Sequence, residues 1–561
     1  MLQGAACFCL PPWSEAQTVG HATPYYPSYI DVAEKAGLTA KTIISGDKTK
    51  DFLLSTTGGG VALFDYDNDG WLDIFIANGW GLGQFPEGQE PFSHLYRNNR
   101  DGTFKDVTQE AGLVRHGWTQ GACVGDFNND GYLDLFVTYY GKNVLFRNNG
   151  NGTFTDITKE AGLLQAEDRY NTGAAFVDYD RDGHLDLFVA NYVGYKEATV
   201  LYDTDPSIAT VRSPVRYGVE GLPGSYNILY HNNGNGTFTD VSQAAGILKP
   251  APTYGFTPCV ADFDNDGWPD IYVAADAKPS LLFHNNHDGT FSEIGLMAGV
   301  ALDINGRPQA GMGVAAVDYD ENGFLDIIKT NFSDDTPSLY RNEGNSFFTD
   351  VTNMSGLAGL TKSVKWGTGF LDFDNDGWPD IFIAGGPIYP PRGAFPPEAG
   401  SRILLRNLGD GRFEDISQHC GPGISVPRCS RGAAVGDIFN TGQIDLLINN
   451  INDRPLLLRN QSPPPSSWLL VRLIGSKTNR AAIGSRVVVE ADGRRQLQEV
   501  QSGGSFCSQN DLRLHFGLGT ARDTKVEVQW LSGTKENFER IPANRLVTIQ
   551  EGKGILSQDT F

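Results

Sequence analysis

The sequence predicts an all-β protein: a seven-bladed β-propeller closed by an N-terminal strand, followed by a small β-sandwich or barrel. Three observations support this prediction. An acidic nonapeptide of the form D-x-D-x-D-G-x-x-D recurs along the chain. A hairpin-like signature accompanies each copy, and part of that signature stands alone near the N-terminus. Repeats of this length, each with several strand-like segments, are typical of propeller blades.

The acidic nonapeptide, called loops 1 to 7 in chain order, begins at residues 65, 126, 178, 262, 318, 372 and 437. In the first repeat, residues 60–64 and 72–77 favour strands on either side of the loop, and residues 93–97 and 103–107 favour two more. The turn Asn99-Arg100-Asp101-Gly102 between the last two is typical of a hairpin. The acidic loop and this turn should therefore share one rim of the propeller. The connections between second and third strands, and between blades, should lie on the opposite rim.

The two ends of the repeat array predict how the ring closes. The last repeat stops at Asn460 and lacks a fourth strand. Residues 29–38 resemble residues 104–113, which include the fourth strand of the first repeat. We expect the N-terminal strand to complete the last blade, because a closed ring leaves no exposed sheet edge.

The acidic loops have the residue pattern of calcium sites. Carboxylates at alternate positions can converge on one hard cation, and glycine at position six permits the sharp turn. Positions one, three, five and nine would give side-chain oxygens, and position seven a backbone carbonyl. An EF-hand does not fit, since Ile76 stands where a bidentate Glu is needed. The predicted ligands in six loops are Asp65, Asp67, Asp69, Trp71, Asp73, Asp126, Asn128, Asp130, Tyr132, Asp134, Asp178, Asp180, Asp182, His184, Asp186, Asp262, Asp264, Asp266, Trp268, Asp270, Asp318, Asp320, Asn322, Phe324, Asp326, Asp372, Asp374, Asp376, Trp378 and Asp380.

We expect about six Ca²⁺ ions with a structural role. A catalytic metal is less favoured, because each loop supplies enough protein ligands to leave no obvious open position. Loop 7 has Phe439 and Thr441 at positions three and five. It should keep the turn without holding an ion firmly.

Composition narrows the function classes. The chain has 561 residues and a formal net charge of −23, which disfavours a nucleic-acid partner. No apolar run approaches the roughly 20 residues that a membrane-spanning helix needs. Residues 1–25 form an N-terminal segment that could be the remnant of a secretion signal, so we expect an extracellular or periplasmic protein.

The candidate ligand surface is the rim opposite the acidic loops. The long connections at 78–92, 191–226 and 385–401 should lie there, and variable loops on a rigid scaffold often bind ligands. At the mouth of the central channel, the candidate binding residues are His116, Trp118, Gln120, Phe256, Trp366 and Arg431. The alternative is that these residues only pack the channel. Cys420 and Cys429 are close enough in sequence to pair, or both stay free.

The C-terminal part differs in character from the repeats. Residues 461–467 form a Pro- and Ser-rich linker. In the domain at 468–550, strands are expected at 468–474, 486–491, 512–516, 525–530 and 546–550, with 551–561 as a tail. The domain contains the sequences NRAAIG at 479–484, LHFGLG at 514–519 and VQWLSG at 528–533.

Residues 26–460 resemble the FG-GAP or VCBS repeats of integrin α-subunit propellers, because the acidic loop and the hairpin signature recur together. Residues 468–550 resemble the ASPIC/UnbV domain. Together the two parts resemble the cartilage acidic protein 1 family. That resemblance implies an exported, calcium-binding, seven-bladed propeller and implies no defined activity.

We therefore expect a calcium-stabilised module that binds or adheres to a protein or glycan. The alternative is a hydrolase, lyase or cyclase with its site on the same face, although no catalytic residues are identified. A structural or assembly component is a third possibility. The sequence leaves the oligomeric state open.

Overall fold

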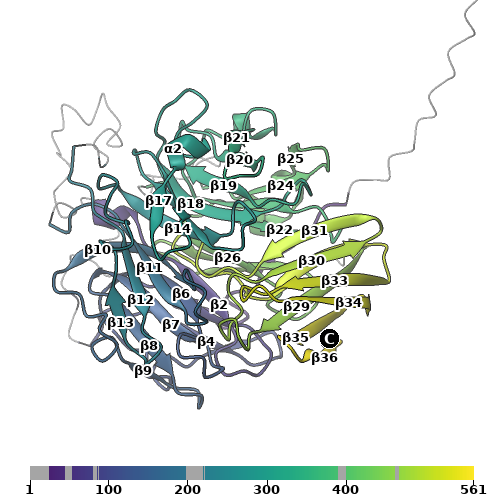
Figure 1. Cartoon of the computed structure of the whole chain (residues 1–561), viewed down its shortest axis with the longest axis horizontal. Coiled ribbons are helices and arrows are strands. Elements are labelled where there is room, and N and C mark those ends of the chain that lie inside the picture. Colours follow the sequence, from purple (N-terminus) through teal and green to yellow (C-terminus); the bar gives the residue numbers. More distant parts are fainter. Residues whose placement is uncertain are drawn as a thin grey trace, which may run out of the picture.

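The computed structural model describes residues 25–44, 53–79, 85, 88–196, 219, 221–388, 400–461 and 466–561. The N-terminal segment 1–24, most of the linker and much of the three long connections predicted at 78–92, 191–226 and 385–401 lie outside these residues. Antiparallel sheets dominate the described chain (Figure 1). The short helical turns are η1 (Leu53–Thr56), α2 (Gly295–Ala298), η4 (Leu357–Gly359), η6 (Ser417–His419) and α3 (Pro422–Ser425). None of the described helices is long and apolar enough to cross a membrane.

The described strands up to residue 461 are grouped in sets of four, called blades 1 to 7. Blades 2 and 3 are joined in one eight-stranded sheet, because Arg169 and Tyr170 pair with Gly141 and Tyr140. Blade 1 contains β2 (Val61–Phe64), β3 (Asp73–Ile76), β4 (His94–Asn98) and β5 (Phe104–Asp106). Blade 2 contains β6 (Trp118–Gly125), β7 (Asp134–Gly141), β8 (Val144–Asn148) and β9 (Phe154–Asp156). Blade 3 contains β10 (Arg169–Val177), β11 (Asp186–Asn191), β12 (Ile228–Asn232) and β13 (Phe238–Asp240).

The later blades repeat this order. Blade 4 contains β14 (Gly255–Ala261), β15 (Asp270–Ala275), β16 (Leu281–Asn285) and β17 (Phe291–Glu293). Blade 5 contains β18 (Gly311–Val317), β19 (Asp326–Asn331), β20 (Ser338–Asn342) and β21 (Phe348–Asp350). Blade 6 contains β22 (Lys365–Leu371), β23 (Asp380–Gly385), β24 (Ile403–Asn407) and β25 (Phe413–Asp415). Blade 7 contains β26 (Ser430–Gly436), β27 (Asp445–Asn450), β28 (Leu456–Asn460) and the N-terminal β1 (Tyr29–Asp31).

The N-terminal strand closes the ring as the sequence predicts. In the antiparallel pairing of β1 with β28, Tyr29 lies opposite Asn460 and Asp31 opposite Leu458. The Tyr29 hydroxyl donates to the carbonyl of Ile444, 3.0 Å away, within blade 7. The innermost strands of successive blades contact one another from β2 to β26, and β26 contacts β2. The blades therefore form a closed β-propeller.

The C-terminal domain is built from two four-stranded sheets. One contains β32 (Leu514–Gly519), β29 (Ser467–Ile474), β35 (Arg545–Gln550) and β36 (Gly554–Asp559). The other contains β31 (Arg494–Glu499), β30 (Arg486–Ala491), β33 (Asp523–Gln529) and β34 (Lys535–Pro542). Buried side chains of both sheets, such as Val471 and Val487, share one apolar core.

Three strands of this domain, β31, β34 and β36, were not predicted from the sequence. The predicted tail at 551–561 and the bounds of one predicted strand also differ from the structure. β31 and β34 lie in stretches that the sequence left unassigned. β36 pairs with β35, so most of the predicted tail at 551–561 belongs to the sheet. The strand expected at 512–516 is shifted to residues 514–519.

A loop of the C-terminal domain fills the channel of the propeller. The amide of Gln509 donates to the carbonyl of Val61 (2.8 Å), and the amide of Val314 donates to the carbonyl of Ser505 (2.7 Å). A Cβ atom on Gly60 or Gly121 would collide with the carbonyl oxygen of Cys507. Glycine in the innermost strands therefore makes room for this segment, called the plug (residues 501–511).

Of the two alternatives for Cys420 and Cys429, the structure has the unpaired one. Both are free. The Cys420 thiol donates to the carbonyl of Ile416 (3.2 Å), and the Cys429 thiol donates to that of Pro387 (3.2 Å). The two thiols therefore belong to different local contacts.

Candidate metal sites

Each acidic loop is folded around the carboxylate at position one. In loop 1, Oδ1 of Asp65 accepts from the amide of Asp69 and Oδ2 accepts from that of Gly70, both at 2.9 Å. The same pair of hydrogen bonds holds the first Asp of loops 2, 4, 5, 6 and 7. The recurring glycine has a positive φ, such as +88° at Gly70, which is strained for a residue with a Cβ. These contacts turn the later loop residues back toward the first.

The carboxylate at position nine is fixed by the third strand of the same blade. In blade 1, Oδ1 of Asp73 accepts from the amide of Asn98 (2.8 Å), and Oδ2 accepts from that of Tyr66 (3.1 Å). The Asn98 side chain donates to the carbonyl of Leu72 (3.0 Å). This Asn recurs at the same place in every blade. The hairpin signature therefore positions the last ligand of the loop, which explains why the two sequence patterns occur together.

The carboxylates gather closely enough to hold a cation. Ligand atoms of Asp65, Asp67 and Asp73 lie within 4.8 Å of one another, as do those in loops 3 and 4. Six loop oxygens are buried without a hydrogen-bond partner: Oδ1 of Asp67, Asp178, Asp180, Asp264 and Asn375, and Oδ2 of Asp445 in loop 7. Four of them belong to predicted ligands of loops 1, 3 and 4. A buried acceptor without a donor is costly, so these oxygens fit a donor set for a hard cation such as Ca²⁺. The backbone carbonyls expected at position seven remain a prediction.

The electrostatics also favour a cation. Burial raises the pKa of Asp178 to about 8, and the carboxylates of Asp186, Asp182 and Asp180 add to the effect. Burial likewise raises the pKa of Asp126 and of Asp318 to about 7. Several negative charges are thus crowded into a poorly hydrated space, where a divalent ion would offset them.

A chain of hydrogen bonds links neighbouring loops around this rim. The Asn68 side chain at position four donates to the carbonyl of Gly131 in the next loop (2.8 Å). The corresponding Asn129, Asn265, Asn375 and Asn440 make the same contact to the loop that follows each. Position four has a left-handed backbone, which Asn tolerates better than most residues. Loops 3 and 5 have Arg181 and Glu321 at this position and contact the C-terminal domain instead.

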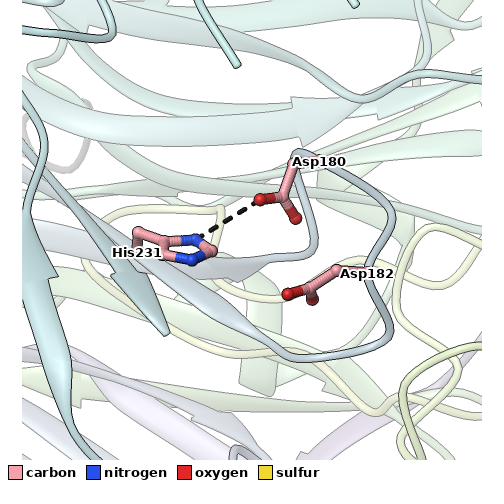
Figure 2. Close-up of side chains that lie close together, drawn as sticks. All are labelled: Asp180, Asp182 and His231. Atoms are coloured by element: carbon pink, nitrogen blue, oxygen red, sulfur yellow. Dashed lines mark ion pairs between the residues drawn. The ribbon is translucent and has the colours of Figure 1, made fainter. Parts of the chain in front are cut away.

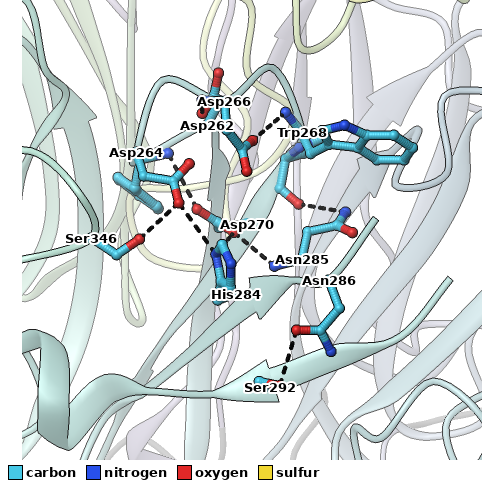
Figure 3. A network of polar contacts seen from close by, with 12 residues as sticks. Asp262, Asp264, Asp266, Trp268, Asp270, His284, Asn285, Asn286, Ser292 and Ser346 are labelled. Atoms are coloured by element: carbon cyan, nitrogen blue, oxygen red, sulfur yellow. Dashed lines mark hydrogen bonds and ion pairs between the residues drawn. The ribbon is translucent and has the colours of Figure 1, made fainter. Parts of the chain in front are cut away.

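Two histidines join the carboxylates, and the sequence analysis missed them. His231 and His284 lie on β12 and β16, at the position just before the recurring Asn. Nδ1 of His231 is 3.1 Å from Oδ1 of Asp186, and Figure 2 shows its ring facing Asp180. Nδ1 of His284 is 3.2 Å from Oδ1 of Asp270 (Figure 3). An alignment of the third strands would have revealed them, because the other five blades have Arg at this position.

Several side chains at position seven pack around the loops. The Trp268 ring stacks on His287 with centroids 4.9 Å apart, and Arg181 lies over its face. Arg494 lies over Trp378, 3.8 Å from the ring centroid. His184 lies 3.4 Å from the Asn129 amide nitrogen, so its ring contacts a side chain of loop 2.

Loop 7 keeps the turn that its sequence predicts, and its weak hold on an ion remains a prediction. Asp437 keeps the hydrogen bonds of position one, but Phe439 is buried, and Arg459 stacks over its ring at 4.4 Å. Arg513 of the C-terminal domain donates to the Asp437 carbonyl (2.9 Å) and to Asn440 Oδ1 (2.8 Å). A guanidinium from another domain thus contributes positive charge beside this degenerate loop.

The C-terminal domain contacts every acidic loop. Arg472 and Arg513 approach loops 1 and 7, and the amide of Arg480 donates to Asn129 in loop 2 (2.7 Å). Arg181 of loop 3 donates to the Leu531 carbonyl (2.9 Å). The remaining contacts are Arg486 with loop 4 and Arg494 with loops 5 and 6. This domain therefore covers the metal-loop rim, a position that the sequence analysis did not anticipate.

The candidate binding residues of the channel are mostly inside the protein. Trp118, Gln120, Phe256, Trp366 and Arg431 are buried, whereas His116 is exposed. Phe506 of the plug lies 5.4 Å from Phe256 and 5.0 Å from Trp366, centroid to centroid. The Arg431 guanidinium lies 4.0 Å from the centroid of the Trp366 ring. Apart from His116, these residues pack the channel in the described structure, as the alternative stated.

Comparison with family models decides the classification. The FG-GAP-like repeat model matches residues 65–137, 126–189, 221–273, 262–329 and 372–448, which together cover more than half of the chain. The chain belongs to the FG-GAP-like repeat family. The "ASPIC and UnbV" model matches residues 475–556 of this FG-GAP-like protein.

Relatives of this FG-GAP-like protein include human cartilage acidic protein 1, which is 25% identical over 371 residues. That match covers 64% of this chain and 50% of the relative, so the chain spans half the length of the human protein it matches. Mouse integrin alpha-7 is 23% identical over 304 residues, 50% of this chain and 24% of that protein. These relatives fit an integrin-like binding module.

Among solved structures, one with similar architecture is an Agrocybe aegerita lectin, described as recognising non-reducing terminal N-acetylglucosamine. It matches 82% of this chain and 95% of the lectin, with 14% identity and a TM-score of 0.37.

Proposed function

We propose that this FG-GAP-like protein is an exported, calcium-stabilised propeller that binds a protein or glycan. One observation supports the calcium part of the proposal: the same folded acidic loop recurs at the first hairpin of successive blades, and the carboxylates of loops 1, 3 and 4 form clusters. Each loop joins the two inner strands of a blade to its third strand, so an ion there would fasten the blade. Repetition of this kind suits a structural role better than a single reactive centre.

Calcium is the ion that most of these loops would take. In loops 1, 2, 5 and 6 the candidate ligands are oxygen atoms of Asp, Asn and the backbone, and Ca²⁺ prefers such oxygen-rich, flexible cages. Buried oxygens without donors, such as Asp67 Oδ1, support an ion over solvated turns. Because loop 7 lacks two of the carboxylates, we propose about six ions.

The surface proposed for ligand binding is the rim opposite the acidic loops. The acidic rim is engaged by the C-terminal domain at every loop, and the plug occupies the channel. On the opposite rim, His116 precedes β6 and Tyr226 precedes β12, and both are exposed. Rigid scaffolds commonly carry their binding groups on such connections.

Binding of the calcium-loaded full chain to arrays of immobilised glycans and of purified secreted proteins tests this proposal. The double substitution H116A/Y226A should weaken binding to any hit at least about tenfold if that rim carries hot-spot contacts. Lys105→Ala, an exposed change on the outer strand β5, serves as the control and should leave binding unchanged. A bound ligand whose affinity is unchanged in H116A/Y226A, or the absence of any bound ligand, would contradict the assignment of this rim.

A further inference from the structure

We infer that loops 3 and 4 bind a divalent transition-metal ion, such as Zn²⁺ or Mn²⁺, through an imidazole nitrogen that the other loops lack. The inference rests on the proposed metal-binding role of the acidic loops and concerns the identity of the ion in these two. It starts from one residue position, the third-strand position just before the recurring Asn. The residues there, from blade 1 to blade 7, are Arg97, Arg147, His231, His284, Arg341, Arg406 and Arg459.

In loop 3 the imidazole lies at the spacing of a metal ligand. Nδ1 of His231 is 3.1 Å from Oδ1 of Asp186 and 3.4 Å from Oδ2 of Asp180. Bonds of about 2.1 Å to a common ion place neighbouring ligand atoms about 3.0–3.4 Å apart, in octahedral or tetrahedral geometry. Ligand atoms of Asp180, Asp182 and His231 also lie within 4.8 Å of one another. Figure 2 shows His231 on the side of the loop toward which Asp180 points.

A buried oxygen in loop 3 independently indicates a cation. Asp178 is only 2% exposed, and its Oδ1 has no hydrogen-bond partner. The other six loops use this oxygen to accept an amide from position five, whereas in loop 3 only the Gly183 amide binds Asp178, through Oδ2. Oxygens of Asp178, Asp180 and Asp186 form one cluster. An ion would supply the partner that this oxygen lacks.

Loop 4 has a similar arrangement. Nδ1 of His284 is 3.2 Å from Oδ1 of Asp270 and 3.4 Å from Oδ2 of Asp264, and the three ligand atoms fall in one cluster. Asp264 Oδ1 is buried without a partner, while its Oδ2 accepts from Ser346 (3.0 Å). In Figure 3 dashed lines join the His284 ring to the carboxylates of Asp264 and Asp270.

The mixed donor set changes which ion is preferred. Ca²⁺ takes oxygen ligands, whereas imidazole nitrogen suits Zn²⁺ and other first-row transition metals. The other five loops have Arg at this position, which carries a fixed charge and has no lone pair for a metal. Arg341 pairs with Glu343 (2.6 Å), and Arg459 stacks over Phe439. The histidines therefore set loops 3 and 4 apart as sites with both nitrogen and oxygen ligands. The competing role for each imidazole is a hydrogen bond from Nδ1 to a carboxylate that holds Ca²⁺.

The test compares the metal-stripped full chain with the variant H231R/H284R, which carries the residue of the other loops. Zn²⁺ titration calorimetry in excess Ca²⁺ should reveal sites in the wild type whose affinity falls at least about tenfold in the variant. Co²⁺ should give stronger visible absorption in the wild type than in the variant, because nitrogen ligation and lower coordination intensify the bands. Arg341→Ala, at the same position of blade 5, should leave both results unchanged.

Equal Zn²⁺ affinity and equal Co²⁺ spectra in wild type and H231R/H284R would overturn the inference and assign the histidines to hydrogen bonding. If that variant does not fold by circular dichroism, the single variants His231→Gln and His284→Gln should each lose part of the Co²⁺ absorption, and unchanged spectra would again refute it. Calcium titration of the same samples separates the two proposals. Absence of Ca²⁺ binding in loops 1, 2, 5 and 6 would contradict the proposed function. The Zn²⁺ affinity and Co²⁺ spectra would still decide the inference about loops 3 and 4.

Discussion

The guanidinium of Arg486, in the C-terminal domain, lies 3.4 Å from the carboxylate of Asp262, the first residue of loop 4. Its Nε atom also lies 2.9 Å from Glu499. The side chains of Arg486, Asp262 and Glu499 are 7%, 5% and 1% exposed. The buried guanidinium of the C-terminal domain thus offsets the charge of a loop 4 carboxylate. The contact between the two domains therefore depends partly on an acidic loop.

Removal of this guanidinium should be strongly destabilising. Arg486→Ala leaves Glu499 buried without its cation, and breaking a buried ion pair from one side typically costs about 3–5 kcal/mol. Denaturant unfolding of the calcium-loaded full chain measures the loss. Arg472→Ala is the matched control, because its contact with Asp65 is longer, 3.9 Å, and more exposed. That control should cost less than about 1 kcal/mol, and equal losses in the two variants would refute the special role of Arg486.

The plug should contribute stability through its aromatic tip. Phe506 is fully buried between Phe256 and Trp366, so Phe506→Ala should lower the free energy of unfolding by about 3–5 kcal/mol. Phe561→Ala, at an exposed C-terminal ring, should change it by no more than about 0.5 kcal/mol. A small effect of Phe506→Ala would mean that the channel does not depend on the plug for its packing.

Repetition made the propeller predictable. Each blade repeats the acidic loop and the hairpin signature, so the four strands assigned in the first repeat could be assigned in the others as well. The closure by β1 was predictable for the same reason, since residues 29–38 resemble the fourth-strand region of blade 1. The loop ligands followed from the chemistry of alternate carboxylates, and the structure brings those of loops 1, 3 and 4 into clusters.

The contacts between unlike parts of the chain were not predictable in this way. Nothing repeats in the plug, so no pattern indicated that Cys507 lies against Gly60 and Gly121. β34 was missed because most of its side chains are exposed or half-buried, which weakens the alternation of apolar and polar residues. His231 and His284 lie on third strands, outside the loop motif, and approach the loop carboxylates only in the folded chain. In the sequence they stand out only when the third strands of all blades are compared, because the other five have Arg at this position.

Stability of the metal-stripped protein should fall as pH rises. Burial raises the pKa of Asp178 to about 8 and those of Asp126 and Asp318 to about 7, above the value of about 4 in an unfolded chain. At these three carboxyl groups the folded state then holds more protons than the unfolded state, so their contribution to stability is complete below a pH of about 4 and is lost as the pH rises to about 8. Melting temperatures across this range measure the trend. Saturating Ca²⁺ should flatten the decline, and a metal-stripped protein that gains stability from pH 5 to 8 would contradict this account.

Substitution of one ligand in one acidic loop should remove one bound ion and leave the propeller ring intact. Asp67→Ala deletes a buried oxygen that has no other partner, so native mass spectrometry should count one Ca²⁺ fewer than in the wild type, with local loosening of blade 1. Thr441→Ala changes an exposed residue of loop 7 and should leave the count unchanged. Global unfolding of Asp67→Ala would show that the loops are not independent fasteners.

The most direct test of the central claim, that the acidic loops fasten the blades by binding calcium, is the melting temperature of the full chain with and without metal. Binding of ions to the folded state alone raises its stability by mass action. We predict a large fall in melting temperature when a chelator removes the metal, and full recovery when Ca²⁺ is restored. A melting temperature that does not respond to either step would contradict the claim.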